Sequence, residues 1–203
     1  MPPKTQALPS IEDRAAGVSR GTARRLERLQ SHTLARRILG IDPGLQRTGY
    51  GLIEFDGVPR LVDAGILTAK PSDDLPTRLQ SLYDALGEVL REHSPDAVVI
   101  EELFSTYAHP RSALLMAHAR GVLMLAAQQS AIPVHSFLPN EVKQVLTGNG
   151  HATKGAVQAA VKSRLKLAEA PEPPDVADAL AIAICFATRQ EAAFKIERGT
   201  TKN

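Results

Sequence analysis

Four acidic residues stand where a carboxylate is either costly or well placed to share a ligand. Asp42 ends one apolar run and Glu101 ends another, whereas Asp175 and Asp178 lie three residues apart at the predicted start of a helix. That spacing puts the last two side chains on one helix face. A carboxylate that enters an apolar core needs hydrogen bonds, a cation or a metal ion. If the four converge, their mutual repulsion calls for divalent cations between them.

An all-oxygen ligand set predicts the chemistry of such a site. With no cysteine or histidine cluster in the sequence, the acids favour Mg²⁺ or Mn²⁺ over Zn²⁺. Such a pocket suits two-metal hydrolysis of a phosphodiester. One ion would help to deprotonate the attacking water and the other would stabilise the leaving 3′-oxygen. No covalent enzyme intermediate is then required.

Two of the acids, Asp42 and Asp175, also have a simpler interpretation. Asp42 precedes a Pro-Gly pair and can start an Asx-turn. Asp175 alone is explained by its place in the first turn of a helix, where an acid complements the helix dipole. Asp178 is harder to explain in this way, because an apolar helix segment follows it. Glu101 and Glu102 point in opposite directions along a strand, so one of them faces inward.

The elements that must position these acids follow from hydrophobic periodicity and turn residues. The first strand, from Arg37 to Asp42, is followed by a returning strand whose glycines leave its surface open to whatever lies above it. Further strands are predicted at 60–68, 95–102 and 132–137. Helices are predicted at 75–92, at 112–129, from 139 or 140, after the capping residue Thr153, and at 175–190. Strands that alternate with helices after an initial meander predict an α/β fold with a mixed sheet.

Length, charge and cysteine content bound the remaining possibilities. The 203 residues, 43% of them hydrophobic, suit one domain with a tail. We predict a basic, disordered extension over 1–36, a nuclease domain over 37–191 and a flexible tail over 192–203. The net charge is only +2, so a polyanion would be bound through local patches. A single cysteine, Cys185, and no membrane-length apolar run predict a soluble intracellular protein.

Five ordered motifs resemble the RuvC family of Holliday junction resolvases over about residues 37–189. They are Ile-Asp-Pro-Gly with Thr-Gly-Tyr-Gly at 41–51, Ile-Glu-Glu-Leu-Phe at 100–104, Ser-Ala-Leu-Leu with Ala-Arg-Gly at 112–121, Val-Lys-Gln with Thr-Gly at 142–148, and Asp-Val-Ala-Asp-Ala-Leu-Ala-Ile-Ala at 175–183. The resemblance implies an RNase H-like fold with a five-stranded mixed sheet flanked by helices. It also implies symmetric nicking of two strands of like polarity at a four-way DNA junction, in recombination and repair.

The same resemblance implies cofactors and partners. It implies two Mg²⁺ ions per subunit, with Mn²⁺ able to substitute, and a homodimer. The helix around Leu115 and Met116 is a candidate surface for that dimer. A branch-migration helicase complex is the implied protein partner, and the bacterial cytoplasm, near the nucleoid, is the implied location.

Residue by residue, the resemblance places Asp42, Glu101, Asp175 and Asp178 on the catalytic, metal-binding positions. Lys143 and Lys154 fall on lysines near the scissile phosphate, and Phe104 falls on an aromatic that stacks on bases at the crossover. Arg111 aligns with a variable position and is a plausible phosphate contact. From the residues alone, the two lysines are ordinary surface cations and Phe104 could equally plug the edge of the core. The N-terminal extension departs from the family pattern, and its role is unexplained.

Two other functions share some of these features. Actin-like ATPases also place Asp and Gly after a first strand, but this chain is short for two lobes and shows no second glycine-rich phosphate loop. A non-catalytic DNA-binding module with the same fold would have no need of four intact acids.

Overall fold

A five-stranded mixed sheet lies at the centre of the computed structural model, which describes residues 34–103 and 110–200. The sheet order is β3-β2-β1-β4-β5. The strands are β1 (Arg37–Asp42), β2 (Arg47–Phe55), β3 (Pro59–Thr68), β4 (Ala97–Glu101) and β5 (Val134–Phe137). The first three strands form an antiparallel meander, whereas β4 and β5 run parallel to β1. The mixed sheet predicted from the sequence is therefore confirmed.

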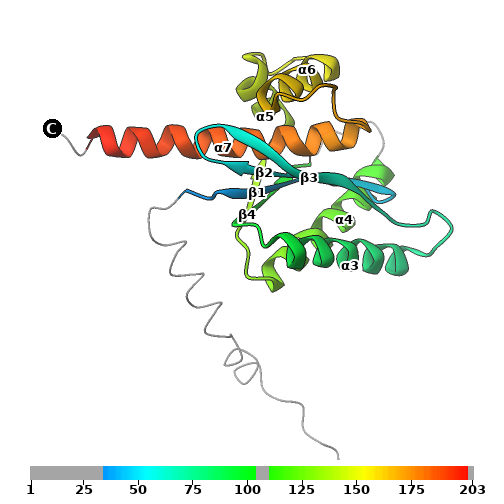
Figure 1. Ribbon diagram of the computed structural model, residues 1–203. Helices are drawn as coiled ribbons and strands as arrows, with labels where there is room; N and C mark the ends of the chain where they lie inside the picture. Colours follow the sequence, from blue (N-terminus) through cyan, green and yellow to red (C-terminus); the bar gives the residue numbers. More distant parts are fainter. Residues whose placement is uncertain (1–33, 104–109, 201–203) are drawn as a thin grey trace, which may run out of the picture. The chain divides into compact units, whose positions relative to one another are not determined.

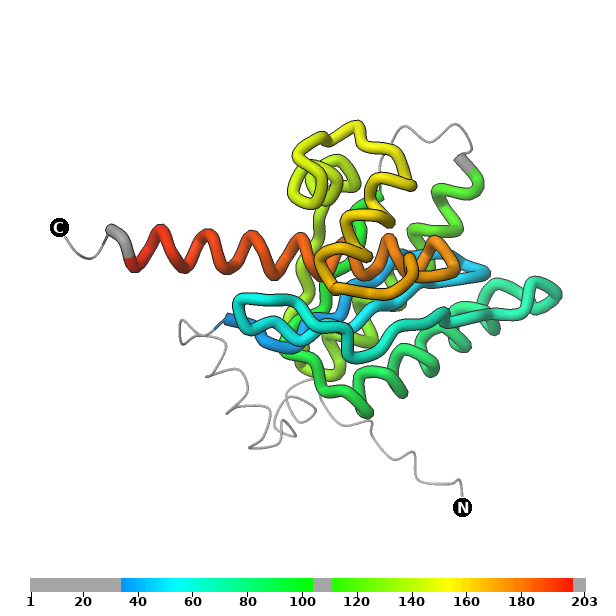
Figure 2. The backbone as a smooth tube through the Cα atoms, turned by 45° about the horizontal axis from the view of Figure 1, so that its top comes forward, coloured from blue at the N-terminus to red at the C-terminus, as the bar shows by residue number. Residues whose placement is uncertain are grey.

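Helices cover both faces of this sheet (Figures 1 and 2). One face carries α3 (Leu75–His93) and α4 (Pro110–Gln129). The other carries α7 (Pro174–Thr200), with α5 (Pro139–Thr147) and α6 (Lys154–Leu165) packed against it. Because both faces are covered, β1 is apolar without interruption over 38–41 and β4 over 97–100.

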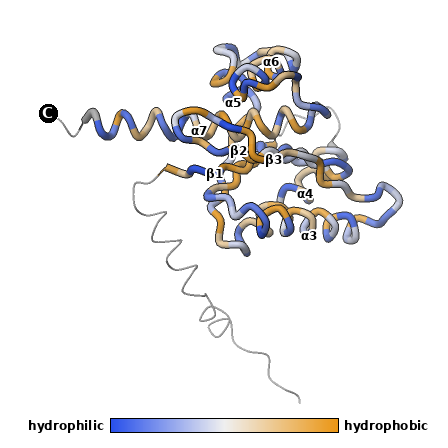
Figure 3. Tube along the Cα trace, viewed as in Figure 1, coloured by the Kyte–Doolittle hydropathy of each residue, from blue (hydrophilic) through white to orange (hydrophobic). Residues whose placement is uncertain are grey.

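Strand alternation divides the buried side chains into two cores. Ile38 and Val99 join the core beneath α5, α6 and α7, whereas Leu39, Ile41 and Ile100 join the core beneath α3 and α4. Figure 3 shows the apolar part of α7 lying over the sheet, with polar residues becoming frequent toward its C-terminal end. Each face of the sheet is therefore stabilised by its own layer of apolar contacts.

The α7 helix lies close to the backbone of β1 and β2, because three glycines of these strands contribute no side chains to the contact. A Cβ atom at Gly40 would collide with the main chain of Ala179, and one at Gly51 would collide with Leu180. A Cβ at Gly49 would collide with the main chain of Asp175. The predicted open surface of the returning strand is thus occupied by a helix.

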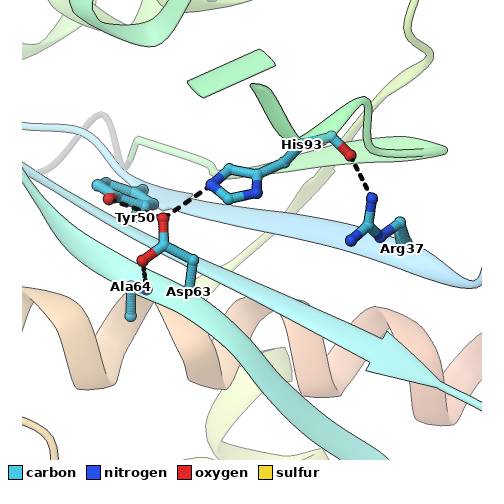
Figure 4. A network of polar contacts seen from close by, with 5 residues as sticks. All are labelled: Arg37, Tyr50, Asp63, Ala64 and His93. Carbon is cyan, nitrogen blue, oxygen red and sulfur yellow. Dashed lines mark hydrogen bonds and ion pairs between the residues drawn. The ribbon is translucent and has the colours of Figure 1, made fainter. Parts of the chain in front are cut away.

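On the opposite face, a polar network ties β2, β3 and α3 together (Figure 4). The Asp63 carboxylate accepts hydrogen bonds from the Tyr50 hydroxyl at 3.0 Å and from the main-chain N–H of Ala64 at 2.9 Å. The Nε2 atom of His93 lies 2.9 Å from the same carboxylate. Arg37 donates to the His93 carbonyl at 2.8 Å and so links the end of α3 to β1.

The largest difference between a predicted boundary and the structure is at the end of the last helix. The last helix was expected to end at Gln190, but α7 continues to Thr200, through most of the segment predicted as a flexible tail. The division into an extension, a nuclease domain and a tail stays a prediction. Among the described residues, no helix is both long and apolar enough to cross a membrane.

Candidate active site

Asp42 and Glu101 end two neighbouring parallel strands. The register pairs Ile41 of β1 with Ile100 of β4, so the next residues, Asp42 and Glu101, lie side by side. Both are two positions beyond a residue that faces α7, so alternation turns both toward α7. Glu102 is exposed, which identifies Glu101 as the inward acid of the pair.

The turn after Asp42 is held by another side chain. The Thr48 hydroxyl, completely buried, donates to the Gly44 carbonyl at 2.7 Å and accepts from the Gly44 N–H at 3.2 Å. No hydrogen bond from this turn to the Asp42 carboxylate is present among the described residues. The Asx-turn interpretation of Asp42 is therefore wrong, and its carboxylate remains available for another role.

Asp175 and Asp178 reach the same place from the first turns of α7. Asp178 is near enough to Asp42 and Glu101 to raise the pKa of both, and Asp175 also raises that of Asp42. Each helix acid is paired with a cation. The Nζ atom of Lys154 lies 3.6 Å from Asp178, and the Nε atom of Arg47 lies 3.4 Å from Asp175.

Burial and crowding raise the pKa values of three of these acids. Burial is the main cause of the increase in the pKa of Asp42 to about 8, and the negative charge of Glu101 is the next. Burial and then the charge of Asp178 raise the pKa of Glu101 to about 7. Burial also raises the pKa of Asp178, against the opposing effect of Lys154. The strand-end acids are thus held in a setting that disfavours their charged forms.

The carboxyls of Asp42 and Glu101 lie close enough to affect each other's pKa, an arrangement that favours a shared proton or a cation between them. Hard divalent cations prefer oxygen donors of this kind, so the residues fit such an ion. Among residues 34–103 and 110–200, however, no three acidic, histidine or cysteine side chains lie close enough to surround an ion as they stand. In this arrangement the two helix acids are paired with Arg47 and Lys154 instead.

Two of the four predicted DNA-binding residues, Lys143 and Lys154, lie close to these acids. The charges of Lys154 and Lys143 both lower the pKa values of Glu101 and Asp178, so both lysines lie close to the acids. Arg111 is exposed in the first turn of α4, without a recorded contact to the acids among the described residues. Phe104 lies outside the described residues.

Sequence reasoning missed two arginines at the site. It gave no attention to Arg47, whose partner Asp175 is far away in the chain. Arg120 stood within a family motif but received no role. Its guanidinium donates to the main-chain carbonyl of Glu101 at 3.0 Å and to the Ser136 hydroxyl at 2.7 Å. The sequence signal for Arg47 was a charge at a β-hairpin turn, and the signal for Arg120 was its place in a family motif.

Comparisons with known proteins agree with this geometry. A family model described as crossover junction endodeoxyribonuclease RuvC matches residues 38–186. The protein of that name from Rhodopirellula baltica is 51% identical over 150 residues, covering 73% of this chain and 84% of the relative. The one from a Roseiflexus species is 42% identical over 166 residues, covering 81% of this chain and 98% of the relative.

Solved structures give the same result. The structure of Thermus thermophilus RuvC in complex with Holliday junction substrate matches with a TM-score of 0.71 and 35% identity, covering 81% of this chain and 97% of that one. A yeast mitochondrial Holliday junction resolvase, 17% identical with a TM-score of 0.62 and covering 91% of each chain, shares the fold. The fold is therefore RNase H-like, as the resemblance implied. The chain belongs to the RuvC family of crossover junction endodeoxyribonucleases.

Proposed function

We propose that this chain resolves Holliday junctions by metal-dependent hydrolysis, nicking two strands of like polarity symmetrically. The family supports the reaction, because its relatives are crossover junction endodeoxyribonucleases. The observation that carries the proposal for this chain is the pair of acids that lie side by side at the ends of β1 and β4, next to the acids of α7. A protein gains nothing in stability by placing two buried acids against each other, so a bound cation is the simplest reason for the arrangement.

Asp42, Glu101, Asp175 and Asp178 would hold the metal, which we propose to be two Mg²⁺ ions per subunit, with Mn²⁺ as a substitute. Divalent ions supply an activated water and stabilise charge on the leaving oxygen. The acids themselves fix the place where the scissile phosphate must lie.

Two lysines would neutralise the DNA backbone beside the acids. Lys154 is 77% exposed, so its ammonium can turn from Asp178 to a phosphate oxygen. Lys143 lies near Glu101 and Asp178 and would contact the same phosphate group or its neighbour. Phe104 as a base-stacking residue and Arg111 as a phosphate contact complete the proposed DNA-binding set, on the strength of the family resemblance.

We propose a homodimer formed through α4. Leu114 and Leu125 are 65% and 51% exposed and stand three helical turns apart, so they share one face of the helix. Leu115, one of the residues first considered for this surface, packs instead against the core beneath α3 and α4. Replacing Leu114 or Leu125 with Glu is expected to convert the dimer to monomers in sedimentation analysis. The helicase partnership and the nucleoid location stay predictions.

The decisive experiment incubates wild-type and Asp178→Asn protein with a synthetic four-way junction, with and without Mg²⁺, and maps nicks on all four strands. We expect paired nicks on two strands of like polarity from the wild type with Mg²⁺ only, and none from the variant. Asp84→Asn, an exposed acid of α3 on the opposite face, serves as the matched control and should nick normally. Normal nicking by Asp178→Asn, or unpaired nicks from the wild type, would contradict the proposal.

A further inference from the structure

Arg120 makes two contacts that join three separate elements. From the middle of α4, its Nε atom donates to the main-chain carbonyl of Glu101 at 3.0 Å. Its Nη2 atom donates to the hydroxyl of Ser136 on β5 at 2.7 Å. The two N–H groups of one planar guanidinium therefore hold the ends of two parallel strands at a fixed distance from the helix.

The contacts of Arg120 lie at the end of β4, where the main-chain pairing of the sheet ends. Glu101 is the last residue of the strand, and its ladder partner is Phe137. One further main-chain bond, from the Glu102 N–H to the Phe137 carbonyl at 2.9 Å, continues the pairing. The position of Glu101 therefore depends on contacts at the strand end rather than on a ladder that continues on both sides.

The side chain of Glu101 and its main chain are held from opposite sides. The carboxyl faces α7, where it meets the carboxyl of Asp42 and the negative charge of Asp178. Arg120 comes from α4, on the other face of the sheet. When the acids are ionised, repulsion between them acts to displace the strand end, and the hydrogen bonds of Arg120 oppose that displacement.

We propose that Arg120 is a positioning residue for the catalytic centre, fixing the backbone of Glu101 so that its carboxylate meets Asp42 at the spacing that a metal ion requires. This inference rests on the proposed function of Glu101. Arg120 also places Glu101 relative to α4, the helix that carries the proposed dimer surface. The two active sites of a dimer would then be set with respect to each other through α4.

The test uses the full-length protein and compares Arg120→Ala, Arg120→Lys and Ser136→Ala with the wild type. Arg91→Ala, an exposed arginine in the last turn of α3, is the control. Three quantities are measured: the nicking rate at saturating junction, the junction concentration that gives half that rate, and the Mg²⁺ concentration at which the thermal unfolding midpoint rises. The third reports metal binding without any reaction.

For Arg120→Ala we expect the saturating rate to fall roughly 10- to 100-fold, because small misplacements of a catalytic group have effects of this size. The half-saturating junction concentration should change less than about twofold, since Arg120 touches no proposed DNA contact, and the Mg²⁺ requirement should rise several-fold. Arg120→Lys should recover part of the rate, because an ammonium can still reach one acceptor. Ser136→Ala should lower the rate by less than Arg120→Ala does.

Parallel measurement of Glu101→Gln separates the two ideas. If Glu101→Gln nicks normally, the catalytic assignment of Glu101 fails. If Glu101→Gln is inactive but Arg120→Ala retains the wild-type rate and Mg²⁺ requirement, only the positioning role is overturned. A lowered unfolding midpoint with an unchanged rate per folded molecule would likewise overturn it, since Arg120 would then serve stability alone.

Discussion

The two faces of the sheet each carry a half-buried aspartate, and the two carboxylates are treated in opposite ways. On the α3 face, Asp63 accepts from a tyrosine hydroxyl and a main-chain N–H and lies 2.9 Å from the ring nitrogen of His93. On the α7 face, no N–H or O–H donor among the described residues reaches the Asp42 carboxylate, which lies instead near the negative charges of Glu101 and Asp178. Asp63 and Asp42 are the same residue type and are similarly buried, so the difference between them is the number of hydrogen-bond donors nearby. A carboxylate with several donors stabilises the fold, whereas one without them is available to bind a ligand.

The sharpest way to break this comparison is to neutralise each aspartate in turn. Asp42→Asn should lower nicking at least about 100-fold, the scale of losing one key electrostatic group in an active site. Asp63→Asn should nick normally but lose about 1–3 kcal/mol of stability, because its donors lose a charged acceptor. Junction nicking and urea unfolding measured on both proteins give the answer. Loss of nicking in folded Asp63→Asn would remove the distinction.

A second test moves α7 rather than an acid. Gly49→Ala forces a methyl group against the main chain of Asp175, so we expect nicking to fall about tenfold or more. Its stability should fall by about 1–3 kcal/mol. The control is Gly87→Ala in α3, where a Cβ meets nothing within 4 Å. That change should leave nicking intact and raise stability by up to about 1 kcal/mol, since alanine is the better helix former.

A third prediction concerns pH. In the folded, metal-free protein the pKa of Asp42 is raised to about 8 and that of Glu101 to about 7. At pH values between the ordinary carboxyl pKa and these raised values, the folded protein therefore binds more protons than the unfolded chain does. Stability should therefore fall as the pH rises through this range, and Mg²⁺ should restore it at pH 8 more than at pH 5. Asp42→Asn should reduce the pH dependence and raise the unfolding midpoint in EDTA at pH 8 by roughly 2–4 °C. Thermal unfolding with EDTA or Mg²⁺ tests this, and an unchanged slope in Asp42→Asn would contradict it.

The smallest expected effect is at Arg47. This side chain is 54% exposed, so its ion pair with Asp175 should contribute less than about 1 kcal/mol. Arg47→Ala removes a cation that competes with metal for Asp175, and so should lower the Mg²⁺ concentration needed for half-maximal nicking by a few-fold. A Mg²⁺ titration at constant ionic strength measures this. A higher Mg²⁺ requirement would show that Arg47 helps the site instead.

Much of this arrangement follows from local sequence pattern. Apolar runs that end in an acid predicted β1 and β4, and strand alternation predicted that only one of Glu101 and Glu102 faces inward. Periodicity placed most helices within a few residues of their observed bounds. The family resemblance supplied the specific reaction and the roles of the lysines, which spacing alone could not distinguish from surface charge.

What the sequence could not provide were contacts between residues distant in the chain. The partners of Arg47 and Arg120 depend on how α7 and α4 pack on the sheet. The end of α7 was also missed, because the apolar pattern stops near Gln190. Most of the residues beyond it, such as Glu191, Ala192 and Ala193, are good helix formers, and the ion pair between Lys195 and Glu191, at 2.8 Å, supports another turn.

The contact of α7 with Gly40, Gly49 and Gly51 has a consequence for how the family can vary. At Gly40 and Gly49 the strand backbone faces the main chain of α7 directly, so the gap between the strand-borne and helix-borne acids is set there by peptide geometry. At Gly51 the side chain of Leu180 fills the space that the missing Cβ leaves. A single methyl group added at Gly40 or Gly49 would widen the gap between the two pairs of acids.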